Sequence, residues 1–145
     1  MILYLDASAL VKRYVAEAGS REVTSLLSKA DVTGTAAISR AEVSAALGKA
    51  VRMKALKHDE AISALQVFTI EWENLARIQI TEVLLARAAA LAWDHGLRGY
   101  DAVHLAAAVF WQEMMGEPVV LATYDRQLWH SASAIGLIAW PELEF

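Results

Sequence analysis

Short apolar runs with strand character alternate along this chain with longer helical patterns, and this alternation is the feature that most constrains the fold. The predicted strands are Ile2–Leu5, Thr35–Ile38, Ile78–Ile80, Val119–Ala122 and Leu137–Ala139. A strand, a helix and a second strand form a βαβ unit, in which the two strands run parallel and the helix covers one face. The sequence therefore predicts a three-layer α/β/α domain around a mostly parallel sheet of about five strands.

Helical patterns fill most of the intervals between these runs. The predicted helices are Ser39–Leu56, His58–Leu75, Glu82–Asp94, Asp101–Met115 and Arg126–Ala134, with Gly96 as a C-terminal stop for the third. No linker, repeat or low-complexity tract interrupts the 145 residues. We therefore expect one domain over residues 1–145, long enough to bury a substantial core.

Composition narrows the class of protein. Hydrophobic residues make up 57% of the chain, which is rich for a soluble domain and suggests apolar surface for a partner. No stretch supplies the roughly 20 apolar residues of a membrane span, and no cationic leader precedes an apolar segment. The lack of cysteine excludes disulfides and thiolate metal sites. We expect a cytoplasmic protein with neither a signal peptide nor a membrane segment.

Four acidic residues stand where the predicted sheet would expose them. Asp6, Glu42 and Asp125 follow predicted strands, and Asp101 opens a predicted helix. In open parallel sheets, ligands bind beyond the carboxyl ends of the strands. We therefore expect these four carboxylates to converge at one edge of the sheet.

Each acid also has a purely structural interpretation. Asp6 and Asp125 could each accept hydrogen bonds from the first N–H groups of a following helix. Ser39 and Glu42 have the spacing of a capping box, and Asp101 could favour the positive end of its own helix. Helix caps are common, so the capping interpretation is strong for any single acid and weakens only when all four acids converge.

A cluster of carboxylates needs a cation. Two carboxylates about 4 Å apart repel by about 4 kcal/mol at an effective dielectric constant near 20. Oxygen ligands favour Mg²⁺, with Mn²⁺ as an alternative, whereas the histidine spacing and the lack of cysteine disfavour zinc. The formal net charge of −4 is unusual for a protein that binds nucleic acid. Bound cations would offset it, with Arg40, Arg98 and Arg126 as candidate contacts to RNA phosphates.

Four motifs carry a resemblance to a known family: the opening "LYLDASALVKRY", then "ISRAEVSAAL", "LRGYDAVHLAAA" and the late "LATYDRQL". In this order and at these spacings they resemble the PIN domain, and most closely the VapC-type toxins of toxin–antitoxin pairs. The resemblance implies a metal-dependent ribonuclease whose acids are Asp6, Glu42, Asp101 and Asp125. It also implies that Ser8 and Thr123 hydrogen-bond the carboxylates or the water around the metal.

The same resemblance implies two protein partners: a second copy of the chain, giving a homodimer, and a VapB-type antitoxin. In the family, the tail of the antitoxin lies in a groove and places a basic residue near the acids. The candidate surface is the pair of helices Ser39–Leu56 and His58–Leu75, with Leu65, Phe68 and Trp72 as apolar contacts. These three residues could equally belong to the core.

Other functions fit the sequence less well. A non-catalytic PIN-like scaffold that binds RNA or protein would be favoured by the loss of an acid, yet all four are present. Aspartate phosphatases place a second Asp two residues after the first, where this chain has Ser8. His104 follows Asp101 by one helical turn and could orient that carboxylate or a substrate phosphate, or be a packed or solvent-facing imidazole.

Overall fold

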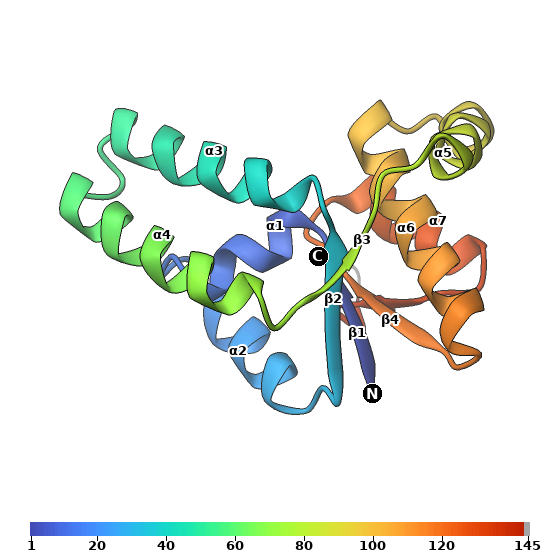
Figure 1. Cartoon of the computed structure of the whole chain (residues 1–145), viewed down its shortest axis with the longest axis horizontal. Helices are drawn as coiled ribbons and strands as arrows, with labels where there is room; N and C mark the ends of the chain where they lie inside the picture. Colours follow the sequence, from blue (N-terminus) through green and yellow to red (C-terminus); the bar gives the residue numbers. More distant parts are fainter. Residues whose placement is uncertain (144–145) are drawn as a thin grey trace.

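The computed structural model describes residues 1–143 and contains a five-stranded sheet in which every pair of neighbouring strands is parallel. The strand order is β3-β2-β1-β4-β5 (Figure 1). The strands are β1 (Ile2–Leu5), β2 (Val32–Ala36), β3 (Ala76–Ile78), β4 (Val119–Ala122) and β5 (Ile138–Trp140). The predicted α/β class and the predicted parallel sheet are therefore confirmed.

Helices cover both faces of this sheet. The elements α1 (Ala7–Leu10), α2 (Ser20–Ser28), α3 (Ser39–Arg52) and α4 (His58–Trp72) lie on one side, together with the 3₁₀ helix η1 (Val11–Arg13). On the other side lie α5 (Glu82–His95), α6 (Gly99–Met115) and α7 (Arg126–Ala134). Figure 1 shows the two groups on opposite sides of the sheet, with α3 and α4 extending away from it.

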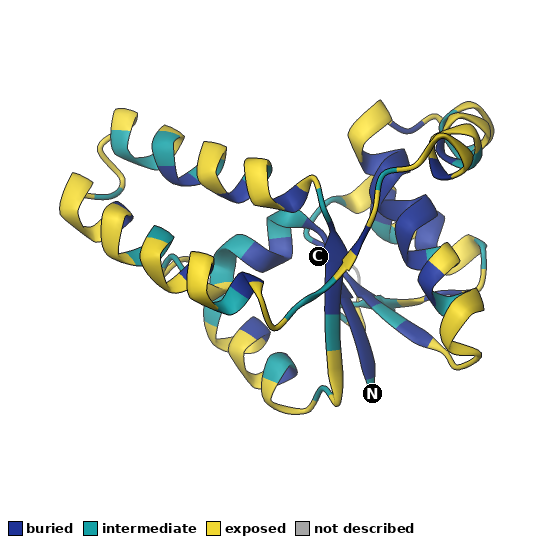
Figure 2. Cartoon of the chain, viewed as in Figure 1, coloured by how far each residue is buried: buried dark blue, intermediate teal, exposed yellow. Residues whose placement is uncertain are grey.

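The central strand divides the core into two parts. Ile2 and Tyr4 face the cluster formed with α5, α6 and α7, whereas Leu3 and Leu5 face the cluster formed with α1 to α4. This alternation follows from the two-residue repeat of a strand, and all four side chains are at most 5% exposed because helices cover both faces. Figure 2 shows the buried residues concentrated in the sheet and in α6.

The second strand begins earlier than its sequence predicts. The expected strand was Thr35–Ile38, but β2 spans Val32–Ala36, and Ile38 already belongs to the turn before α3. Gly34 obscured the start of the strand, because glycine weakens strand patterns. Here glycine is required: a Cβ atom at this position would lie 2.7 Å from the Trp111 ring and 3.1 Å from the carbonyl oxygen of Ala76.

The helices α3 and α4 form an arm whose base is packed into the core. Phe68 and Trp72 on α4 are 1% and 3% exposed, so their assignment to a partner surface was wrong and the core interpretation holds. Their rings pack edge to face, with centroids 5.5 Å apart. The exposed apolar side chains of α4 are instead Ile62, Val67 and Ile70.

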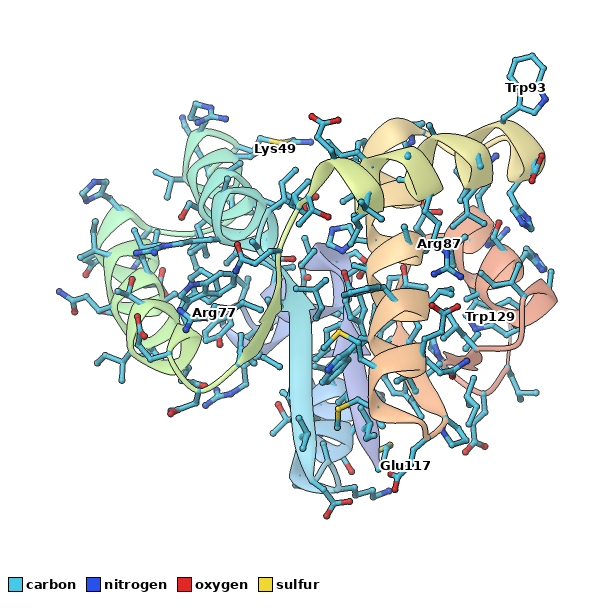
Figure 3. The ribbon with its side chains drawn as sticks, turned by 45° about the vertical axis from the view of Figure 1, so that its right-hand side comes forward. Lys49, Arg77, Arg87, Trp93, Glu117 and Trp129 are labelled. Carbon is cyan, nitrogen blue, oxygen red and sulfur yellow. The ribbon has the colours of Figure 1, made fainter. Side chains whose placement is uncertain are left out.

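Two further features complete the description of residues 1–143. None of the helices there combines the length and the apolar character that crossing a bilayer requires. Trp93 is 89% exposed and projects from α5 into solvent, as Figure 3 shows.

Candidate active site

Asp6 lies directly after β1, and three hydrogen-bond donors fix the position of its carboxylate. Its Oδ1 accepts hydrogen bonds from the Ser8 hydroxyl at 2.7 Å and from the Ala9 N–H at 3.0 Å, and its Oδ2 accepts one from the Thr123 hydroxyl at 2.6 Å. The backbone N–H groups of Tyr124 and Asp125 donate to the same two hydroxyls. The hydroxyl protons are therefore directed at Asp6, which serves both as the cap of α1 and as a buried, oriented carboxylate.

Arg98 joins the other two aspartates. Its Nε lies 3.4 Å from Oδ2 of Asp101, and its Nη2 lies 3.2 Å from Oδ2 of Asp125. Asp125 follows β4 and also caps α7, because its Oδ1 accepts a hydrogen bond from the Leu128 N–H at 2.9 Å. Asp101 sits in the first turn of α6, with a side chain that is only 5% exposed. The capping prediction for Asp125 is thus confirmed, while its second oxygen faces the site.

Glu42 does not form the predicted capping box. The Ser39 hydroxyl pairs instead with the Thr35 hydroxyl at 2.6 Å, and α3 begins without a side-chain cap. The Oε1 atom of Glu42 lies 2.7 Å from Nε2 of His104, which projects from α6. The packed alternative for His104 is confirmed, because the imidazole is buried. Its contact with Glu42 joins residues 62 positions apart and was not predicted.

Burial and mutual repulsion control the charges of these acids. Burial raises the pKa of Asp6, against the charge of His104 and the donors Ser8 and Thr123. Burial and the neighbouring charge of Asp125 raise the pKa of Asp101 to about 6, although Arg98 lowers it. The charge of Asp6 also raises the pKa of Asp101, by a smaller amount.

His104 supplies opposing charge from inside the protein. It is 1% exposed, and burial favours its neutral form. The hydrogen bond to Glu42 and the charges of Asp6, Glu42 and Asp101 outweigh this effect and raise the pKa of the imidazole. Arg98 thus links Asp101 with Asp125, and His104, which holds Glu42, lies where the charges of Asp6 and Asp101 act on it.

The oxygen atoms of the site suit a hard divalent cation, although they do not form a complete set of metal ligands. Within residues 1–143, no three His, Asp or Glu side chains are placed to hold a metal ion together. The reason is local: Arg98 lies between Asp101 and Asp125, and His104 holds Glu42. The carboxylate and hydroxyl oxygens are nevertheless the ligands that Mg²⁺ prefers, and burial raises the pKa of both Asp6 and Asp101.

The three arginines proposed as RNA contacts differ in their surroundings. Arg98 is exposed along much of its length, and its guanidinium also lies 5.1 Å from the centre of the Tyr100 ring. Arg40 is exposed in the first turn of α3, and Arg126 is exposed at the first position of α7. Arg98 forms ion pairs with two acids of the site, Asp101 and Asp125, and this link between them could not be predicted from the sequence.

Comparisons with known proteins agree with this geometry. The PIN domain model matches residues 3–132. The chain is 35% identical to "Ribonuclease VapC45" of Mycobacterium tuberculosis over 136 residues, which cover 93% of this chain and 92% of that protein. It is also 35% identical to "Ribonuclease VapC3" of Pyrobaculum aerophilum over 130 residues, covering 88% and 92% of the two chains.

A solved structure gives the same fold. The chain superposes on a protein in a "Toxin-antitoxin complex from Klebsiella pneumoniae" with a TM-score of 0.67 and 16% identity, covering 99% of both chains. The family match spans most of the sequence, and the VapC proteins resemble it over nearly their whole length. The chain therefore belongs to the PIN domain family and, within it, to the group of the VapC proteins.

Proposed function

We propose that this protein is a Mg²⁺-dependent endoribonuclease that acts as the toxin of a toxin–antitoxin pair. The observation that carries the proposal is the pair of buried carboxylates, Asp6 and Asp101, which Thr123 and Arg98 respectively link to Asp125. Burial raises the pKa of both carboxylates, and a bound cation would stabilise their charged forms. The names of the VapC relatives support RNA as the substrate.

The chain's own residues have distinct roles in this proposal. Asp6, Asp101 and Asp125 would hold Mg²⁺, or Mn²⁺ in its place, directly or through water, and Glu42 completes the cluster. When bound, the ion supplies positive charge that stabilises the reacting phosphate and makes a nearby water more acidic. Ser8 and Thr123 keep Asp6 oriented through their directed hydroxyl protons. Glu42 accepts a proton from the attacking water, and hydrolysis leaves a 5′-phosphate and a 3′-hydroxyl.

The positive side chains explain how an acidic protein could bind RNA. Arg98 lies at the mouth of the site and can exchange its contact with Asp101 and Asp125 for an RNA phosphate once a cation neutralises those acids. Arg40 and Arg126 provide further contacts along the RNA backbone. The net charge of −4 then reflects the cation site rather than an exclusion of nucleic acid.

The experiment is cleavage of total RNA by purified protein with Mg²⁺ or with EDTA. We expect discrete fragments only from the wild type with Mg²⁺, and none from Asp101→Asn. The exposed Asp94 provides a matched control, because Asp94→Asn removes the same charge elsewhere and should cleave like the wild type. Equal cleavage by Asp101→Asn, or no cleavage by the wild type, would leave the non-catalytic scaffold as the better account.

A VapB-type antitoxin and a second copy of the chain are the proposed protein partners. The Klebsiella pneumoniae structure is titled a toxin–antitoxin complex, which supports an antitoxin for this chain. The exposed Ile62, Val67 and Ile70 on α4 offer apolar contact area on the predicted arm. Light scattering after size-exclusion chromatography, with and without co-expressed antitoxin, tests both partners: a monomer in both samples would refute them.

A further inference from the structure

His104 is held at both ring nitrogens, so its orientation is fixed. Its Nδ1 lies 2.7 Å from the hydroxyl of Tyr4, and its Nε2 lies 2.7 Å from Oε1 of Glu42. The imidazole is 1% exposed and Tyr4 is fully buried in β1. The edge of one ring faces the other, with centroids 6.0 Å apart and planes inclined by 72°. The imidazole cannot turn without breaking one of these two hydrogen bonds.

The direction of the bond to Glu42 follows from simple chemistry. An ionised carboxylate only accepts hydrogen bonds, so Nε2 must carry the proton. In the neutral ring the Tyr4 hydroxyl donates to Nδ1, and in the charged ring Nδ1 donates to the Tyr4 oxygen. In both cases Nε2–H donates to Glu42, so the contact does not depend on the charge of the imidazole.

The three residues come from elements that are far apart in sequence. Tyr4 lies on β1, His104 on α6 in one helical layer, and Glu42 on α3 in the other. The chain of hydrogen bonds therefore passes across the end of the sheet that carries Asp6. A carboxylate can accept about four hydrogen bonds, so the single bond from His104 leaves Glu42 with most of its capacity for water or a cation.

We propose that His104 is a positioning residue that holds the Glu42 carboxylate toward the other acids, and that Tyr4 fixes the imidazole for this task. This inference rests on the proposed nuclease function, because it gives Glu42 its orientation toward the attacking water. His104 itself touches neither substrate nor cation. It keeps the partly exposed side chain of Glu42, in the first turn of α3, from turning into solvent.

Two substitutions separate the two ends of the imidazole. In His104→Gln the amide nitrogen lies near the position of Nε2 and still donates to Glu42, while the bond to Tyr4 is lost. In His104→Asn the amide reaches only the position of Nδ1, so the bond to Tyr4 is kept and the bond to Glu42 is lost. Both variants are polar and smaller than histidine, so a merely structural role would not favour His104→Gln.

We expect His104→Asn to lower kcat for RNA cleavage at least tenfold with little change in KM, and His104→Gln to retain most of the wild-type kcat. In a Glu42→Ala background, His104→Asn should cause no further loss. Equal losses in the two histidine variants, or a full additional loss in the Glu42→Ala background, would overturn the proposal.

A spectroscopic measurement tests the contact without any activity. In ¹⁵N-histidine spectra of the metal-free protein, we expect Glu42→Ala to shift the Nε2 resonance of His104 and to speed exchange of its proton. The matched control is Glu117→Ala, because Glu117 is exposed beyond the far end of α6 (Figure 3) and should leave the resonance unchanged. An unshifted resonance in Glu42→Ala overturns the positioning role, whereas a shift without RNA cleavage by the wild type refutes only the nuclease.

Discussion

Replacing Asp101 with Asn should stabilise the metal-free protein at neutral pH. The folded pKa of about 6 lies above the ordinary value of 3.8, so ionisation of Asp101 opposes folding. Fully counted, that difference corresponds to about 3 kcal/mol, and solvent screening at the open side of the site reduces it to about 1.5 kcal/mol. This free energy already includes the loss of the contact with Arg98, because Arg98 lowers the pKa of Asp101 and the value of about 6 takes that into account.

The size of this stabilisation depends on pH. Well below pH 3.8 Asp101 is protonated in both the folded and unfolded chains, so wild type and Asp101→Asn should have similar free energies of unfolding there. The advantage of the variant should grow between pH 4 and pH 6 and stay constant above that range, because the folded protein then carries the unfavourable charge.

Urea denaturation in EDTA at pH 4 and at pH 7.5 measures this difference. At pH 7.5 we expect Asp101→Asn to exceed the wild type by about 1.5 kcal/mol, or by a few degrees in Tm. The control Asp94→Asn should follow the wild type at both pH values within a few tenths of a kcal/mol. A variant that is less stable than the wild type at pH 7.5 would refute the account of a repelling carboxylate cluster.

Three further perturbations test individual contacts. Gly34→Ala should lower the free energy of unfolding by about 1–3 kcal/mol, because the new Cβ atom would meet the indole of Trp111 on α6. In the control Gly48→Ala the Cβ atom meets only a flexible arginine, so thermal melts should show a gain of up to about 1 kcal/mol. Thr123→Val should cost about 1–3 kcal/mol in urea denaturation by removing a donor to Asp6, and Thr123→Ser should restore most of it. Arg98→Gln should raise the pKa of Asp101 above about 6 in a ¹³C carboxyl titration, and an unchanged pKa would contradict the bridging geometry.

The parts of the fold that were predictable from the sequence are those with continuous patterns. The strands β1 and β4 begin and end at the predicted residues, because each is a run of apolar residues that helices cover on both sides. The helix α7 also matches its prediction. The helix α2 (Ser20–Ser28) was not predicted, because only Val23 and Leu26 are buried along it and the apolar repeat is short.

The site was predictable in its acids but not in its contacts. Asp6 and Asp125 could be placed at one sheet edge because parallel topology brings the carboxyl ends of β1 and β4 together. The link from His104 to Glu42 joins separate helical layers, and no local spacing encodes such a contact. The capping box at Ser39 had the right spacing, but the strand residue Thr35 offered a buried hydroxyl partner that local patterns do not reveal. The catalytic and metal-binding roles of the four acids stay predictions.

Binding of Mn²⁺ to the metal-free protein tests the central claim most directly. Electron paramagnetic resonance of free Mn²⁺ at pH 7.5 reports binding without any RNA. Four carboxylates that share one cation site predict saturable binding by the wild type and by Asp94→Asn, and binding at least tenfold weaker to Asp101→Asn. Equal affinity in all three proteins, or no binding by the wild type, would contradict a shared site for a divalent cation.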